Sequence, residues 1–378
     1  MAVSYSCNGA ARCGGTGVQA DGRTCALCGG NGLCQRCTGG VMSVGEPAIG
    51  RMMPAARGTG RGMARKLIGH WTIGRRLLAG TALAGLAASS PAFAQTWTGG
   101  AGTSSWFDAA NWSPSIVPTS GTTIIINNGS TATPVVINVA GAQSGGVKLG
   151  NVVGSIGSLL VTGAGRITDT GTYFIVGDRG EGAITVSNGG QVTTKYAVVG
   201  NYPNSIGKAL VTGAGSQWTA TQLMVSWDDK AVGTFEVTDG GKLQIVNPGG
   251  NAIVTLGSDS TTADGTLTIT GKDSSFLITN GVTFNIGAPG RGVFKVLDGA
   301  SADTSAIVNI NSQSQTLVSG TGSIWSAQGG LNNAGTLTVT DGGALDSNGR
   351  LRVLATGTAT VTQGGTAKAT EVEVFGVG

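Results

Sequence analysis

The residue types that most often carry chemistry are gathered in the first quarter of this 378-residue chain. All six cysteines and the single histidine, His70, lie within residues 1–94. Residues 95–378 therefore cannot form a Ser-His-Asp triad, offer a cysteine nucleophile or bind zinc through histidine or cysteine. We expect this larger part of the chain not to be an enzyme and to need no cofactor.

Four of the cysteines form two C-x-x-C pairs, Cys25 with Cys28 and Cys34 with Cys37. Four thiolates at such spacing can bind zinc tetrahedrally, and Cys25-Ala-Leu-Cys28-Gly-Gly-Asn-Gly resembles the zinc-binding repeats of DnaJ-type co-chaperones. Only five residues separate the two pairs, however, and the other two cysteines form no comparable pair. The spacing disfavours a working zinc site.

One acidic cluster in residues 95–378 lies beside an aromatic residue. Asp228 and Asp229 follow Trp227 directly. An indole can stack on a sugar face, and carboxylates can bind sugar hydroxyls or a cation, so these three residues are the candidate ligand site. The alternative interpretation is an exposed loop. Because glycan hydrolases need only two or three convergent carboxylates, a carbohydrate-active enzyme remains the alternative function.

A repeated unit must position these residues. Each unit contains a short alternating strand, a turn rich in glycine and aspartate, and a second strand that ends in an apolar residue and glycine. Nine units recur at drifting intervals of 21 to 32 residues, which is typical of a solenoid rather than a propeller. The residue that follows the first strand is Gly163, Asn188, Gly213, Asp239, Gly271, Asp298, Gly320, Asp341 or Gln363.

The strands alternate as half-buried strands do. In residues 265–270, Leu267 and Ile269 point to one side and the threonines to the other. One unit cannot bury such an apolar stripe alone, so successive units must stack. We therefore predict an all-β chain, a single-stranded parallel β-helix of about nine repeats over residues 151–378. A β-sandwich would need hairpin signals in phase, which the Asn-Gly steps do not supply.

Carboxylates and aromatic residues recur in register with these units. Asp239, Asp298 and Asp341 occupy the turn position, where an aspartate accepts backbone hydrogen bonds, so we assign them a structural role. Trp218, Trp325 and Phe276 occupy another shared position, which predicts a packing slot. Residues 95–150 are expected to form an N-terminal cap over the first coil, built around Trp97, Trp106 and Trp112.

Composition divides the chain at residue 94. Lys and Arg outnumber Asp and Glu by 10 to 2 over residues 1–94, whereas residues 95–378 hold 13 against 17. Met63-Ala-Arg-Lys, an apolar core over Leu77–Ala88 and Ala92-Phe-Ala94 follow in the order of a secretory signal. We predict a signal peptide over residues 63–94, cleaved between Ala94 and Gln95. Ordinary Sec export is favoured over the twin-arginine route, and residues 1–62 are a disordered leader or the result of an upstream start.

The repeats are similar to those of a known family. Val-Thr-Gly-Ala-Gly-Ser-Gln-Trp218 and Val-Thr-Asp-Gly-Gly-Lys-Leu243 resemble the β-strand repeats of bacterial autotransporter passengers and of some PEP-CTERM proteins. The likeness covers about residues 96–376. It implies an exported protein of a Gram-negative bacterium, located at the cell surface, in the outer membrane or outside the cell. Such passengers usually precede a translocator barrel, which this sequence lacks, so we expect a truncated frame.

The resulting functional hypothesis is surface display. It implies an adhesive rod whose outer faces contact host surfaces, glycans or other cells. The alternatives are the carbohydrate-active enzyme and a purely structural spacer. We expect no nucleic-acid partner. The glycine-rich turns are not phosphate loops, because none has the lysine pattern of that motif.

Overall fold

The computed structural model describes residues 4–5, 13–14 and 94–376. β1 (Ser4–Tyr5) and β2 (Cys13–Gly14) form a short antiparallel pair in the N-terminal unit. The two C-x-x-C pairs considered for zinc, residues 15–62 of the leader and signal residues 63–93 lie outside the described residues. Within the described residues, no helix has the length and apolar character needed to cross a membrane.

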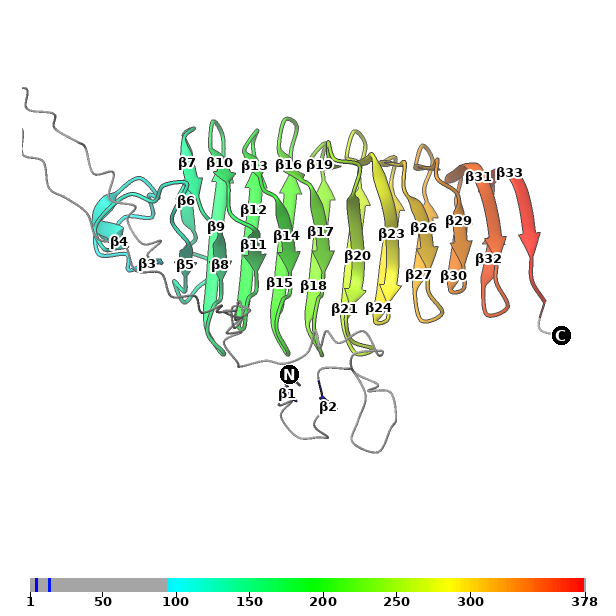
Figure 1. Cartoon of the computed structure of the whole chain (residues 1–378). Helices are drawn as coiled ribbons and strands as arrows, with labels where there is room; N and C mark the ends of the chain where they lie inside the picture. Colours follow the sequence, from blue (N-terminus) through cyan, green and yellow to red (C-terminus); the bar gives the residue numbers. More distant parts are fainter. Residues whose placement is uncertain (1–3, 6–12, 15–93, 377–378) are drawn as a thin grey trace, which may run out of the picture. The chain divides into compact units, whose positions relative to one another are not determined.

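Residues 94–376 form a parallel β-solenoid of about 11 turns of the chain, or coils (Figure 1). The all-β parallel β-helix predicted from the sequence is confirmed. Among the strand pairs of residues 94–376, only β3 (Gln95–Trp97) with β4 (Trp112–Ser113) is antiparallel, which excludes the hairpin-built sandwich. A 3₁₀-helix, η1 (Ala109–Asn111), lies between these two strands.

A complete coil contributes one strand to each of three parallel ladders. The first ladder contains β6 (Val135–Ile137), β9 (Ile156–Thr162), β12 (Glu181–Ser187), β15 (Ile206–Thr212), β18 (Val232–Thr238), β21 (Asp264–Thr270), β24 (Arg291–Leu297), β27 (Gln315–Ser319), β30 (Thr336–Thr340) and β32 (Thr358–Val361). The second contains β7 (Ala142–Ser144), β10 (Arg166–Asp169), β13 (Gln191–Thr193), β16 (Gln217–Ala220), β19 (Lys242–Val246), β22 (Ser275–Thr279), β25 (Ser301–Thr304) and β28 (Ile324–Ala327).

The third ladder contains β5 (Ile124–Ile126), β8 (Val147–Leu149), β11 (Tyr173–Val176), β14 (Tyr196–Val199), β17 (Gln222–Val225), β20 (Ala252–Ser258), β23 (Gly281–Ala288), β26 (Ile307–Ile310) and β29 (Leu331–Asn333). Two long strands, β31 (Ala344–Val353) and β33 (Thr366–Val374), continue both the second and the third ladder. β3 extends the third ladder by pairing in parallel with β5.

The core is made of columns of identical or similar side chains stacked from coil to coil. Inward residues of the first ladder pair in register, for example Val186 with both Val161 and Val211. The buried column of β-branched residues is Val161, Val186, Val211, Val237, Ile269, Val296, Val318 and Val339. Leu267 and Ile269 point inward as the alternation predicted, and the threonines between them are only partly buried.

The repeat alignment located the turns correctly but undercounted the coils. All nine residues aligned from the sequence, from Gly163 to Gln363, have positive φ angles between 48° and 94°. The structure nevertheless has about 11 coils where about nine were predicted. The missed coils lie before Gly163, where β5 to β8 are strands of three residues that carry no copy of the turn motif.

A second set of glycines is required by close approach of the backbone. Gly157, Gly182, Gly207, Gly233, Gly265 and Gly292 pair in register and are buried in the first ladder. A Cβ atom on Gly207 would overlap the backbone nitrogen of Gly200 and the carbonyl oxygen of Val176. This glycine column therefore lets the end of each third-ladder strand lie against the start of the next first-ladder strand.

We expect Gly207→Ala to lower the free energy of unfolding by about 1–3 kcal/mol or more, because the added methyl group has no space between two backbone segments. Chemical unfolding followed by circular dichroism measures this loss. Gly121→Ala is the matched control, since a Cβ on Gly121 meets no atom within 4 Å and its φ angle is ordinary. Equal stability of the two variants would contradict the packing role of the glycine column.

Candidate binding groove

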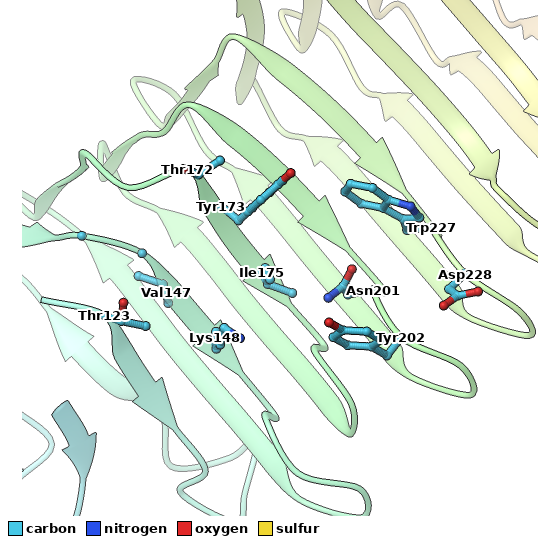
Figure 2. A pocket seen from close by; sticks show the side chains of 12 residues that line it. Thr123, Val147, Lys148, Thr172, Tyr173, Ile175, Asn201, Tyr202, Trp227 and Asp228 are labelled. Atoms are coloured by element: carbon cyan, nitrogen blue, oxygen red, sulfur yellow. The ribbon is translucent and has the colours of Figure 1, made fainter. Parts of the chain in front are cut away.

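A groove of about 490 Å³ lies on the outer face of the solenoid, over the third ladder (Figure 2). Three aromatic side chains from three successive coils line it: Tyr173 of β11, Tyr202 beyond the end of β14 and Trp227 beyond the end of β17. Polar side chains line it too, among them Lys148, Asn201 and Asp228. We call this feature the aromatic groove.

The parallel register brings the aromatic rings of the groove together. Tyr173 pairs with Tyr196 across β11 and β14, and their ring centroids are 5.5 Å apart. Tyr173 also contacts Trp227, with centroids 6.0 Å apart and an interplanar angle of 64°. Ile175 also lines the groove, although only 5% of its surface is exposed. The groove therefore combines aromatic rings with the apolar surface of Ile175.

Two of the three groove aromatics lie in corner loops, the loops that join a third-ladder strand to the first-ladder strand of the next coil. Tyr202 lies in the corner loop of residues 200–205, and Trp227 lies in that of residues 226–231. The Tyr202 amide donates to the Asp178 carbonyl oxygen at 2.9 Å, and the Trp227 amide donates to the Gly200 carbonyl oxygen at 2.8 Å. Each loop thus hydrogen-bonds to the loop before it, which fixes the rings relative to one another.

Ser226, directly before Trp227, has a strained backbone. Its φ angle is 64°, and the same corner is occupied by Gly200 in the preceding coil and by Gly257 in the following one. A non-glycine residue in this left-handed region carries a conformational penalty. The Ser226 hydroxyl offsets part of it by donating to the Ala231 carbonyl oxygen at 2.7 Å across the base of the loop. Strain of this kind concentrates at functional sites.

A buried carboxylate anchors the polar side of the groove. The Asp178 side chain is 1% exposed and accepts a hydrogen bond from Asn201 Nδ2 at 2.7 Å. Its other oxygen makes no hydrogen bond but lies 3.5 Å from Lys148 Nζ, so the two charges form an ion pair. Arg179 lies over the Tyr202 ring, with its guanidinium carbon 4.5 Å from the ring centroid.

The structure places two of the three predicted ligand residues, Trp227 and Asp228, in the aromatic groove. Asp229 belongs to the same corner loop as Trp227, but its carboxylate accepts hydrogen bonds from the hydroxyls of Thr262 and Ser260 in the next corner loop. The Thr262 hydrogen bond is the main reason that the pKa of Asp229 is lowered from its ordinary value. Asp229 thus links two corner loops instead of lining the groove.

Sequence reasoning missed Tyr173, Tyr202 and Lys148 as groove residues. The chain contains four tyrosines, and the three beyond residue 94 all fall between positions 173 and 202. That concentration was the signal available in the sequence. The concentration of tyrosines alone did not predict a site, because only the pairing of the strands brings β11 close to the corner loops of the next two coils.

The aromatic positions predicted to serve packing do so. Trp218 and Trp325 are fully buried and Phe276 is 1% exposed, as the packing slot required. Each tryptophan donates its ring N–H to a threonine of the preceding coil, Trp218 to Thr194 and Trp325 to Thr304. Near the first coil, Trp106 and Trp112 are buried and pack edge to face, with centroids 4.9 Å apart, and Trp97 packs against Trp112 at 5.1 Å.

The turn aspartates have a structural role, but through a different hydrogen bond from the predicted one. Asp239, Asp298 and Asp341 each accept from a hydroxyl of the preceding coil at 2.9–3.0 Å, whereas backbone donors were expected. The donors are Thr212, Thr270 and Ser319, each of which ends a first-ladder strand. Because successive turns stack in register, the hydroxyl of one coil reaches the carboxylate of the next.

Comparisons with protein families, with curated proteins and with solved structures found no match for this chain. No group of three or more His, Cys, Asp or Glu side chains suited to a metal ion occurs among the described residues. The chemistry of the aromatic groove must therefore be argued from its own geometry. Its aromatic faces, isolated carboxylate and ion pair are suited to reversible binding.

Asp169 is a buried carboxylate that hydrogen-bonds Ser144, next to the groove-lining Gly145 and Gly146. It is 4% exposed, and one of its oxygens accepts a hydrogen bond from the Ser144 hydroxyl at 2.7 Å. Burial raises the pKa of its carboxyl above the ordinary 3.8, while the Ser144 hydrogen bond acts in the opposite direction. Because the folded state holds the proton more tightly than the unfolded state, Asp169 makes folding less favourable as the pH rises through its raised pKa.

We expect Asp169→Asn to be more stable than the unaltered protein at about pH 7, and the difference to shrink as the pH is lowered towards about 4. The amide group cannot ionise, so it avoids burying a charge, and its oxygen can still accept the Ser144 hydrogen bond. Urea unfolding at several pH values measures the difference. Ser144→Ala is the companion variant, because losing the hydroxyl should raise the Asp169 pKa further and steepen the pH dependence. A difference independent of pH would contradict this assignment.

Proposed function

We propose that the chain is an exported protein of a Gram-negative bacterium that contacts other surfaces from outside the cell, and that the aromatic groove makes the contact. The observation that carries the proposal is the gathering of partly exposed aromatic rings on one outer face. Tyr173 and Tyr202 are 40% and 41% exposed, and the ring of Trp227 lies beside them. Aromatic residues that are both exposed and rigidly held are typical of recognition surfaces.

The start of the solenoid supports export with cleavage after Ala94. β3 begins at Gln95, whose backbone nitrogen donates to the Thr123 carbonyl oxygen at 2.8 Å. The Gln95 side chain is also anchored, donating to the Ile116 carbonyl oxygen at 2.7 Å. Cleavage between Ala94 and Gln95 therefore leaves every strand of the solenoid intact, and the new N-terminus lies at a strand end.

A carbohydrate-active enzyme is the second candidate, and the groove favours binding over hydrolysis. Asp228 carries the only carboxylate among the groove-lining residues, and glycoside hydrolysis ordinarily uses a pair of carboxyl groups facing the bond to be cleaved. Asp178 lies nearby, but its side chain is buried and paired with Lys148. A structural spacer would not require the tyrosines to gather in one groove.

Export is tested by expressing the full chain in a Gram-negative host. We expect the protein recovered outside the cytoplasm to begin at Gln95, as mass spectrometry of its N-terminal peptide would show. Ala94→Glu should retain the signal, because the cleavage site requires small residues, whereas Thr96→Ser should be cleaved normally. A full-length product confined to the cytoplasm would contradict the proposal.

Surface contact is tested with the exported protein on whole cells or on extracted cell-surface material. We expect Trp227→Ala and Tyr202→Ala each to weaken binding by about tenfold, which corresponds to about 1.4 kcal/mol for a lost aromatic contact. Phe375→Ala is the matched control, because it removes a ring that is 48% exposed and does not line the groove. Equal binding by all three variants would show that the groove is not the contact surface.

A further inference from the structure

Building on the proposed function, we propose that the aromatic groove binds a neutral saccharide of two or more hexose rings, held against Tyr202, Trp227 and Tyr173. The three rings come from three successive coils of the third ladder (Figure 2). Strands of neighbouring coils are spaced about 4.8 Å apart, so the aromatic surface extends over more than one sugar ring. The groove of about 490 Å³ is within the range of about 300–1,000 Å³ that small-molecule sites occupy.

The arrangement of apolar and polar groups matches the surface of a sugar. A pyranose ring presents C–H bonds on its faces and hydroxyls around its edge. In the groove, aromatic rings and Ile175 supply apolar surface, while Asp228 and Lys148 lie at its polar side. The negative π face of an aromatic ring attracts the C–H groups of the sugar. The Asp228 carboxylate can accept hydrogen bonds from the sugar hydroxyls, and the Lys148 ammonium can donate hydrogen bonds to them.

The two charged side chains that line the groove, Lys148 and Asp228, balance each other, which favours a ligand without net charge. Lys148 is also paired with the buried Asp178, and Arg179 lies over the Tyr202 ring. An anionic polysaccharide or a nucleic acid would need a surplus of positive charge to neutralise it. The four charged groups provide none.

Capture of an extended peptide by strand addition is not available at this face. β11, β14 and β17 each pair on both sides within the third ladder, so their backbone hydrogen-bonding groups are already used. A ligand in the groove must therefore be recognised through side chains. This favours the face of a sugar over the backbone of a peptide.

The probe for the experiment is a panel of neutral trisaccharides, namely maltotriose, cellotriose, mannotriose and chitotriose, each compared with its monosaccharide. Tryptophan fluorescence can follow binding to the exported protein, because Trp227 is the one tryptophan that lines the groove. We expect at least one trisaccharide to bind more tightly than its monosaccharide, with less than a twofold change in affinity between about 0.05 and 0.5 M NaCl.

Variants assign the binding to the groove. Trp227→Ala and Tyr202→Ala should each weaken trisaccharide binding by about tenfold, measured by calorimetry. Trp227→Phe should retain most of the affinity while losing the fluorescence change, because phenylalanine still offers a ring for stacking. Phe375→Ala should bind as the unaltered protein does. Binding that survives both alanine variants would overturn the assignment to the groove.

The outcomes separate this inference from the proposed function. Trp227→Ala could abolish contact with cell surfaces although no saccharide binds and periodate oxidation of the surface glycans leaves contact by the unaltered protein intact. The groove would then recognise another class of ligand, and only the saccharide inference would fail. An affinity that falls steeply with salt would indicate an anionic ligand and overturn the neutral assignment. If neither surface contact nor saccharide binding is detected, both fail together.

Discussion

The solenoid depends on one contact, in which the backbone at the end of each third-ladder strand lies directly against the glycine column of the first ladder. At Gly182, for example, a side chain would occupy the position of the Gly177 backbone nitrogen. Because this contact recurs in successive coils, it keeps the glycines in register and brings the chain round to begin the next coil. The columns of stacked valines can then form, since register decides which side chains meet inside.

The same contact determines where functional residues can lie. It holds the two ends of each corner loop together. The residues between these ends therefore project outward from a rigid base. Tyr202 and Trp227 belong to two such loops, and hydrogen bonds between neighbouring loops hold them in place. Ser226 occupies the corner that Gly200 and Gly257 occupy in the neighbouring coils, and it directly precedes the groove tryptophan. The backbone contact at the glycine column thus supplies the rigidity of the aromatic groove, although the glycines themselves do not line it.

The features that repeat in every coil could be predicted from the sequence. Those that occur once, where side chains of particular coils meet, could not. Alternation identified Leu267 and Ile269 as inward, and the turn motif located residues with positive φ such as Asp239. The first coils carried no motif and were missed. Trp227 was identified because an acidic pair follows it, but its neighbour Tyr173 belongs to a different coil, and only the register of the third ladder brings the two rings together.

The corner loops also differ in length while the strands on either side keep their pairing. The loops of residues 177–180, 200–205 and 226–231 connect equivalent strands, and β9, β12, β15 and β18 remain in unbroken register across them. Lengthening a loop whose two ends already touch adds little entropic penalty. Insertions at this corner can therefore accumulate during evolution without disturbing the core, which allows one solenoid to acquire different binding surfaces while its repeat remains unchanged.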